Sequence, residues 1–287
     1  EMGAITVSQQ ACLQNSGEAL EILCEHGLNP NEVFGEEAES LLHMAVTHQK
    51  VPSIATLINH SADVSLSDGR GRVPLHLAAH TGNVDVLNAL LRCHKDTLNF
   101  FQLLMGETSE VSNDSKLLID LDIKIDPPIK EGEIEMTDAK GKPKSAREIK
   151  QERDEKKNKG NRRTALHIAA MLGHSKFVER LLSVGAKVNM LDSNGRNALH
   201  LAVLHSKGTK LEKTAQVLLS HGIDTHTADK NGQTPLILAA SMGKSEAIEL
   251  LYKARKRDWF LAINRRDSKG CSALFHACRV RKLHNDC

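Results

Sequence analysis

Hydrophobic residues between positions 164 and 185 recur at helical spacing in two short blocks with a polar break between them. The first block, TALHIAAMLG, begins at Thr164, a residue type that caps helix N-termini, and ends at Gly173, a residue type that ends helices. The second block, HSKFVERLLSVG, stops at Gly185, and a turn from Asp192 to Gly195 follows it. The pattern predicts two helices and then a projecting β-turn, which we call the finger.

The same block recurs along the chain, marked by a Leu-His pair in its first helix. These pairs contain His43, His76, His167 and His200. His43 and His76 are 33 residues apart, and so are His167 and His200, whereas His76 and His167 are 91 residues apart. Two further copies, TPLILAA and SALFHAC, carry Ile237 and Phe275 in place of the histidine. Because two short helices cannot bury both of their faces alone, we expect the copies to stack and share a core.

These copies resemble the ankyrin repeat family, whose 33-residue unit is a β-turn and two helices with a T-P-L-H-x-A motif. DGRGRVPLHLAA, DSNGRNALHLAV and DKNGQTPLILAA each align with the family's finger, N-cap and first helix. The resemblance covers about residues 39–99 and 162–287. It implies an all-α fold, an ankyrin-repeat solenoid interrupted by a long insertion.

The resemblance divides the chain into five parts. We expect a degenerate N-terminal capping repeat over residues 1–38, two repeats over 39–99, an insertion over 100–161, three repeats over 162–270 and a partial C-terminal repeat over 271–287. Within the first part, residues 17–37 are typical of a second helix and a finger.

Two fingers depart from the family pattern. The finger before Thr164 has Lys159 and Arg162 where the family has Asp and Gly. The finger before Ser40 contains Gly35 and Ala38. The shapes of these two turns are therefore the ones that the resemblance defines least.

The insertion contains segments unlike a repeat. FFQLLMG continues the apolar pattern of the preceding helix, and we expect it to pack on the stack. KLLIDLDIKID alternates apolar and polar residues, and so does EIEMTD, which predicts a β-hairpin. A capping box at Ser145 and Glu148 begins the charged segment AREIKQERDEKKNKG, a helix with little to bury. In the alternative interpretation, Asp138 and Gly141 belong to a decayed finger followed by a first helix.

Charged residues of the insertion allow two further hypotheses. Asp120, Asp122 and Asp126 could suggest calcium, but the glycine-containing loop with a terminal Glu of an EF-hand is absent, so a polar strand face is favoured. The basic segments 140–144 and 156–163 could form a nuclear import signal, against the simpler interpretation of a solvated charge run.

The repeated histidines could be catalytic, metal-binding or structural. Equivalent histidines on packed helices lie about 8–10 Å apart, whereas two ligands of one zinc ion lie within about 4 Å of each other. Catalysis needs a converging acid or nucleophile, but Leu and Ala recur beside each histidine. We therefore expect half-buried imidazoles that hydrogen-bond to the backbone of their own or the adjacent finger.

Composition narrows the functional class. The net charge is +2, which argues against nucleic acid as a partner, and only 3% of residues are aromatic. The six cysteines form no CxxC pair, so neither a zinc site nor a disulfide framework is indicated. No apolar run approaches the length of a membrane span. These features favour a cytoplasmic location, or a nuclear one if the basic segments act as an import signal. The chain begins at Glu1 and stops at Cys287 partway through a copy, so it could be a piece of a larger protein.

Members of the resembled family bind partners on the concave side, through finger tips and first-helix exits. Arginine recurs after the finger glycine position, and Met and Leu near it offer adaptable apolar contact. The predicted partner-binding residues are Arg70, Arg72, Arg163, Met171, Leu172, Asn194, Arg196, Leu204, His205, Lys230, Gln233 and Met242. Their arrangement favours an acidic, partly apolar peptide, although finger tips are also charged simply because they are solvated.

The predicted function is that of a non-catalytic protein–protein interaction module, or scaffold, that uses no cofactor, metal or small-molecule substrate. No GxSxG, P-loop or HExxH motif indicates an enzyme. The alternative is a regulatory or targeting domain of a larger enzyme, ion channel or bacterial-type effector. The sequence identifies neither the partner nor the oligomeric state.

Overall fold

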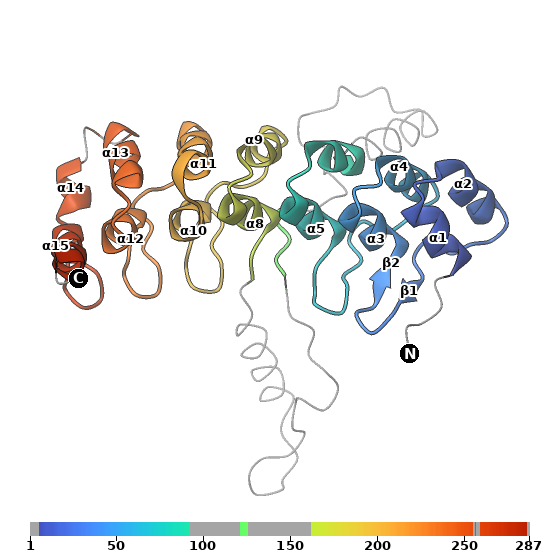
Figure 1. Cartoon of the computed structure of the whole chain (residues 1–287), viewed down its shortest axis with the longest axis horizontal. Helices are drawn as coiled ribbons and strands as arrows, with labels where there is room; N and C mark the ends of the chain where they lie inside the picture. Colours follow the sequence, from blue (N-terminus) through green and yellow to red (C-terminus); the bar gives the residue numbers. More distant parts are fainter. Residues whose placement is uncertain (1–5, 92–120, 126–161, 255, 257–258, 286–287) are drawn as a thin grey trace, which may run out of the picture. The chain divides into compact units, whose positions relative to one another are not determined.

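The protein is described here by a computed structural model that covers residues 6–91, 121–125, 162–254, 256 and 259–285 (Figure 1). It forms two compact units, residues 1–133 and 134–287, which we call unit 1 and unit 2. The predicted docking of FFQLLMG, the EIEMTD strand, the charged helix and the decayed finger all lie outside the described residues.

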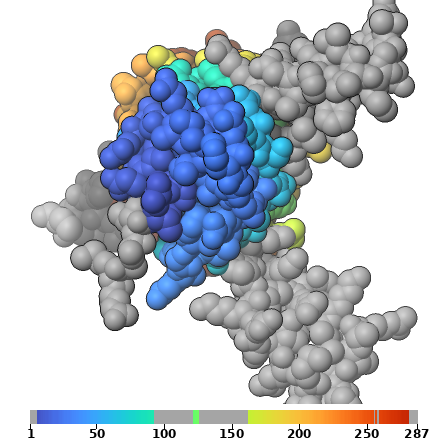
Figure 2. All heavy atoms as spheres, turned by 90° about the vertical axis from the view of Figure 1, so that its right-hand side faces the viewer, coloured from blue at the N-terminus to red at the C-terminus, as the bar shows by residue number. Residues whose placement is uncertain are grey.

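Unit 1 begins with a pair of helices rather than with one. Helices α1 (Val7–Leu13) and α2 (Gly17–Glu25) start at the capping side chains of Thr6 and Ser16. The sequence pattern predicted α2 but not α1. A hairpin of two-residue strands, β1 (Val33–Phe34) and β2 (Glu39–Ser40), forms the first finger. This end of unit 1 faces the viewer in Figure 2.

The rest of unit 1 repeats the helix pair. Helices α3 (Leu41–Thr47) and α4 (Val51–Asn59) are followed by α5 (Pro74–Thr81) and by helical residues 84–91. The first helices pack side by side, α1 on α3 and α3 on α5, while α2 packs on α4. Leu41, Leu42, Ile54 and Leu57 are completely buried between them.

Unit 2 has the same arrangement, with fingers that project from its layer of first helices (Figure 1). The first helices are α8 (Ala165–Leu172), α10 (Ala198–His205), α12 (Pro235–Ser241) and α15 (Ala273–Asn285). The second helices are α9 (Ser175–Ser183), α11 (Gly208–Ser220) and α13 (Ser245–Ala254), and the short α14 (Trp259–Ile263) comes before the last finger. Successive members pack on each other within each layer. Thr164 caps α8 and Gly173 ends it, as predicted.

The four repeated histidines have a structural role, as predicted, but they are buried rather than half-buried. Each is at most 1% exposed. Nδ1 accepts the backbone N–H of the N-cap residue, 3.2–3.3 Å away, so Nε2 carries the proton. Nε2 donates to a carbonyl oxygen: His43 to Arg72, His76 to Ile123, His167 to Arg196 and His200 to Gln233, at 3.0–3.2 Å. The burial was underestimated because the next finger, or the Ile123 segment, closes over the ring.

The strand expected over KLLIDLDIKID is wrong for the part that the structure describes. Leu121–Ile125 form a turn and an irregular segment. Leu121 is 6% exposed, whereas Asp122, Ile123, Lys124 and Ile125 are all half-buried, so the two faces of an alternating strand are not distinguished. The backbone carbonyl of Ile123 bonds to a side chain of α5 instead of to a sheet partner.

Candidate binding surface

An aspartate side chain builds each regular finger. Asp68, Asp192, Asp229 and Asp267 each accept two backbone N–H groups on Oδ1, from the residues two and four positions later, at 2.8–3.0 Å. The residue three positions after each Asp is a glycine with φ between 72° and 75°. These contacts give every regular finger one shape, so equivalent residues of successive fingers present their side chains in the same way.

Backbone hydrogen bonds also join neighbouring fingers within each unit. The N–H of Gly69 donates to the carbonyl of Glu37, that of Lys230 to Asn194 and that of Ser268 to Asn231, at 2.5–3.0 Å. Gly69 has no room for a side chain, because a Cβ atom there would lie 2.9 Å from the Glu37 carbonyl oxygen. The fingers therefore form a connected edge whose side chains are held at a fixed spacing.

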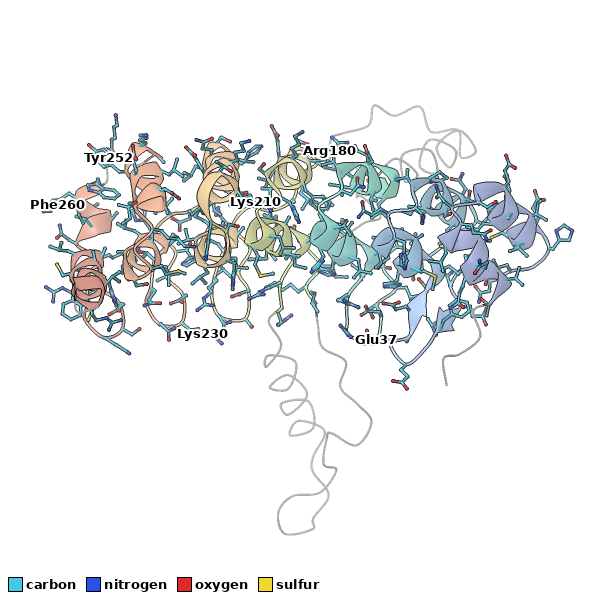
Figure 3. The ribbon with its side chains drawn as sticks, viewed as in Figure 1. Glu37, Arg180, Lys210, Lys230, Tyr252 and Phe260 are labelled. Atoms are coloured by element: carbon cyan, nitrogen blue, oxygen red, sulfur yellow. The ribbon has the colours of Figure 1, made fainter. Side chains whose placement is uncertain are left out.

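In unit 1 the predicted arginines are already paired with carboxylates. Arg72 contacts Asp68 at 2.7 Å and lies 3.6 Å and 3.7 Å from Glu37 and Glu39. Arg70 pairs with Glu37, and Figure 3 labels Glu37 on the first finger. Three carboxylates thus face two guanidinium groups, so this part of unit 1 offers no surplus positive charge to an acidic partner.

In unit 2, each of the two predicted arginines lies near one buried carboxylate of the following finger. Arg196 Nε donates to Asp229 Oδ2 at 3.2 Å, and Arg163 Nε lies 3.9 Å from Asp192 Oδ2. Gln233 occupies the position equivalent to Arg163 and Arg196 in the next finger, but it is neutral and cannot supply a positive charge to Asp267. His276 donates to Asp267 Oδ2 at 2.8 Å instead and holds the pKa of that carboxyl below its usual value.

Positive charges gather around His205 at the exit of α10. Burial, followed by the nearby charges of Arg163, Arg196 and Lys244, lowers the pKa of His205, which is nevertheless exposed. Lys244 was not predicted as part of this surface, because in the sequence it lies in the break between two helices. The charges of two finger arginines and of a lysine from the following repeat therefore all act on His205.

Apolar side chains flank this positive group. Met171, Leu172 and Leu204 are half-buried and Met242 is 42% exposed. Arg163 Nη1 lies 3.2 Å from the Met171 sulfur, which connects a finger residue to the end of α8. Unit 2 therefore combines positive and apolar groups near its first-helix exits.

The remaining predicted residues lie along the fingers of unit 2. Lys230 is exposed at a finger tip, as Figure 3 shows, and Asn194 and Gln233 are half-buried. The carbonyl of Gln233 accepts the bond from His200, so its backbone is structural while its side chain belongs to the edge. Of the twelve predicted residues, Arg70 and Arg72 lie in unit 1 and the other ten in unit 2.

One group of side chains within the described residues has the donor types that metals prefer. One ligand atom each from Asp267, Cys271 and His276 lie within 4.8 Å of one another. The finger geometry accounts for their proximity: Asp267 begins the finger, Cys271 follows its glycine, and His276 replaces the arginine that neutralises the other aspartates. We therefore treat the group as part of the finger.

Comparisons with known proteins extend the resemblance found in the sequence. The family model of ankyrin repeats matches residues 7–100, 137–229 and 207–287. The match over 137–229 begins within the residues predicted to form the insertion.

Two curated relatives and one solved structure illustrate the similarity. A probable 26S proteasome regulatory subunit, p28, of Saccharomyces cerevisiae is 36% identical over 116 residues, which is 40% of this chain and 47% of that protein. The ankyrin repeat protein nuc-2 of Neurospora crassa is 25% identical over 272 residues, 92% of this chain and 22% of that protein. The crystal structure of the Bcl-3 ankyrin repeat domain covers 96% of this chain and 95% of its own, with a TM-score of 0.64 and 19% identity. The chain thus spans less than half of the length of these two curated relatives.

None of the helices in the described parts of the chain combines the length and the apolar character that crossing a bilayer requires.

Proposed function

The chain belongs to the ankyrin repeat family, whose repeats generally act as protein–protein interaction modules, and we propose from this premise that unit 2 binds an acidic, partly apolar segment of a partner protein. The ankyrin repeat fold is typically non-catalytic, so we assign no reaction to the chain. The binding residues are those on the fingers and first-helix exits of unit 2.

The observation that carries this proposal is the convergence of positive groups around His205. After burial, the charges of Arg163, Arg196 and Lys244 lower its pKa. Asp192 and Asp229 pair with the two arginines, whereas Lys244 donates to the carbonyls of Val203 and Ser206. An incoming carboxylate would meet several cations that the fold already holds in place, so little side-chain entropy is lost on binding. Met171, Leu204 and Met242 would contact apolar residues next to the carboxylates.

The ion pairs of unit 1 limit the proposal to unit 2. In unit 1, Arg70 and Arg72 are satisfied by Glu37, Glu39 and Asp68. Adding a carboxylate there would require breaking existing ion pairs. We therefore expect Arg70 and Arg72 to stabilise their fingers rather than to bind the partner.

Phage-displayed random peptides provide a test that does not require the partner to be known. We expect peptides selected on the full chain to be enriched in Asp and Glu together with Leu, Met or Phe. The double variant His205→Glu/Lys230→Glu should bind the selected peptides about tenfold more weakly, because both changes are on exposed side chains of the positive surface.

The control variant makes the same change of charge on the second helices. Lys176→Glu/Lys213→Glu alters two exposed lysines of α9 and α11 and should leave peptide binding unchanged. Selected peptides without acidic residues, or equal losses in both double variants, would refute the proposal.

A second candidate function is that of a regulatory or targeting domain within a larger enzyme, channel or effector. It is favoured by the relatives, which are at least twice as long as the part that this chain matches. Transcript sequencing across both ends of the coding region would decide it, since catalytic motifs or hydrophobic spans would be evident at once.

A further inference from the structure

His76 differs from the other repeated histidines in the group that it binds. His43, His167 and His200 donate to the carbonyl of the residue directly after the positive-φ residue of the next finger. His76 Nε2 donates at 3.0 Å to the carbonyl of Ile123, 47 residues further along the chain. The sequence around Ile123 has no Asp-x-x-Gly turn, so this acceptor is not part of a regular finger.

The segment around Ile123 is also anchored differently from a finger. Leu121, two residues before the acceptor carbonyl, is 6% exposed. The equivalent residues of the regular fingers are Arg70, Asn194 and Asn231, which are polar and exposed or half-buried. Leu121–Ile125 therefore combine a finger-like hydrogen bond with an apolar anchor that the fingers lack.

We propose that the His76 side of α5 is a binding site for an extended peptide segment, which the chain fills with its own residues 121–125. The site recognises a leucine two residues before a carbonyl that accepts the Nε2 proton of His76. It lies in unit 1 and does not depend on the function proposed for unit 2.

Two features suit this site to a peptide rather than to a fixed element of the core. The hydrogen bond is made to a backbone carbonyl, which every peptide carries, and the leucine side chain adds selectivity. Because residues 121–125 are tethered to the site, they occupy it at a high effective concentration, and an outside segment has to displace them.

Trypsin cleavage after Lys124 reports whether the segment is docked. We expect His76→Phe to accelerate cleavage at Lys124 at least about fivefold, the factor that corresponds to one lost intramolecular hydrogen bond. Phe275 occupies this frame position in the last repeat, but it is 54% exposed there whereas His76 is buried, so the folding of His76→Phe has to be checked by circular dichroism. His167→Phe removes the equivalent bond in unit 2 and should leave cleavage at Lys124 unchanged.

A second pair of variants keeps the test valid if His76→Phe does not fold. Leu121→Asp lies outside the repeat helices and should also accelerate cleavage at Lys124, whereas Leu121→Met should retain protection because it keeps the apolar anchor. Cleavage at Lys124 at the wild-type rate in both His76→Phe and Leu121→Asp would overturn the proposal.

A synthetic peptide tests the site directly. The fluorescence anisotropy of a fluorescein-labelled LIDLDIKID peptide, residues 118–126, should rise when the Leu121→Asp chain is added. It should rise less with the wild-type chain, because that chain's own segment competes for the site. It should not bind the Leu121→Asp/His76→Phe chain, and a scrambled peptide should bind neither. Binding that is independent of His76 would show that the peptide does not use this site.

Discussion

At the residue scale, the fingers show a backbone requirement that persists where the usual residue is missing. The position two residues before the N-cap has a positive φ in both units: 74° at Gly71 and 73° at Gly195, but also 47° at Ala38 and 40° at Arg162. A side chain makes this left-handed conformation unfavourable by about 1–2 kcal/mol. The positive φ of this turn is therefore maintained by the surroundings of the finger as well as by glycine.

Ala38 allows this cost to be measured. We expect Ala38→Gly to raise the free energy of unfolding of unit 1 by about 0.5–1 kcal/mol, because relief of the strained φ exceeds the extra flexibility of the unfolded chain. Native-state hydrogen exchange on peptides from α3 would detect it. Ala55→Gly, within helix α4, serves as the control and should lower the same free energy by about 0.5–1 kcal/mol. A decrease in both variants would contradict the strain argument.

At the element scale, the ends of the first helices are completed in two ways. Helix α8 ends at Gly173, whose φ of 76° lets its N–H return to the helix. Helix α10 ends at Ser206 in an extended conformation, so its last carbonyls need other donors. Lys244 from the following repeat supplies them: Nζ lies 2.5 Å from the Val203 carbonyl oxygen and 2.8 Å from that of Ser206.

Removal of this ammonium group should therefore destabilise unit 2. We expect Lys244→Met to lower the free energy of unfolding by about 1.5–3 kcal/mol, the range for hydrogen bonds from a charged group. Urea unfolding followed by the fluorescence of Trp259, the single tryptophan of the chain, would measure it. Lys213→Met, an exposed substitution on α11, should stay within about 0.5 kcal/mol of the wild type. A similar small effect for Lys244→Met would show that water satisfies these carbonyls equally well.

At the scale of the whole molecule, buried histidines link successive repeats in both units and make stability depend on pH. Burial is the main cause that lowers the pKa of His43 and of His200, although the carbonyls of Arg72 and Gln233 act in the opposite direction. The folded state therefore takes up protons less readily than the unfolded state. The stability that the neutral, buried histidines contribute is complete above about pH 6.5 and is lost as the pH falls toward their pKa values in the folded state.

This dependence can be assigned to one histidine. We expect the free energy of unfolding of unit 2 to fall as the pH is lowered, by up to about 1.4 kcal/mol per pH unit for each buried histidine. Urea titrations at pH 7.5, 6.5 and 5.5 would measure this slope. His200→Ile should reduce the slope, and the buried Ile237 shows that isoleucine fits this position. Leu199→Ala, which destabilises the same helix without removing a titrating group, should keep it. An undiminished slope in His200→Ile would place the titration elsewhere.

Much of the fold could be predicted because it is local. Thr164 and Gly173 mark the ends of α8 through contacts within a few residues, and the repeat spacing aligns all equivalent positions. The ion pairs of the candidate binding surface could be predicted less well. The recurring arginines were found, but their partners Glu37, Asp192 and Asp229 lie about one repeat away, and periodicity does not indicate which of two neighbouring fingers a long side chain reaches.

The sequence by itself determined the repeat, its frame, the helix pairs apart from α1, and the structural role of the histidines, because these depend on spacing and on short-range capping. Only the tertiary structure decided which carboxylates the arginines pair with, that the charge of Lys244 acts on His205, and that the Ile123 carbonyl accepts the His76 proton. The physical reason is distance along the chain. Burial and charge pairing depend on which residues meet after the repeats stack, and a single sequence does not show that His76 and Ile123, 47 positions apart, are joined by a hydrogen bond.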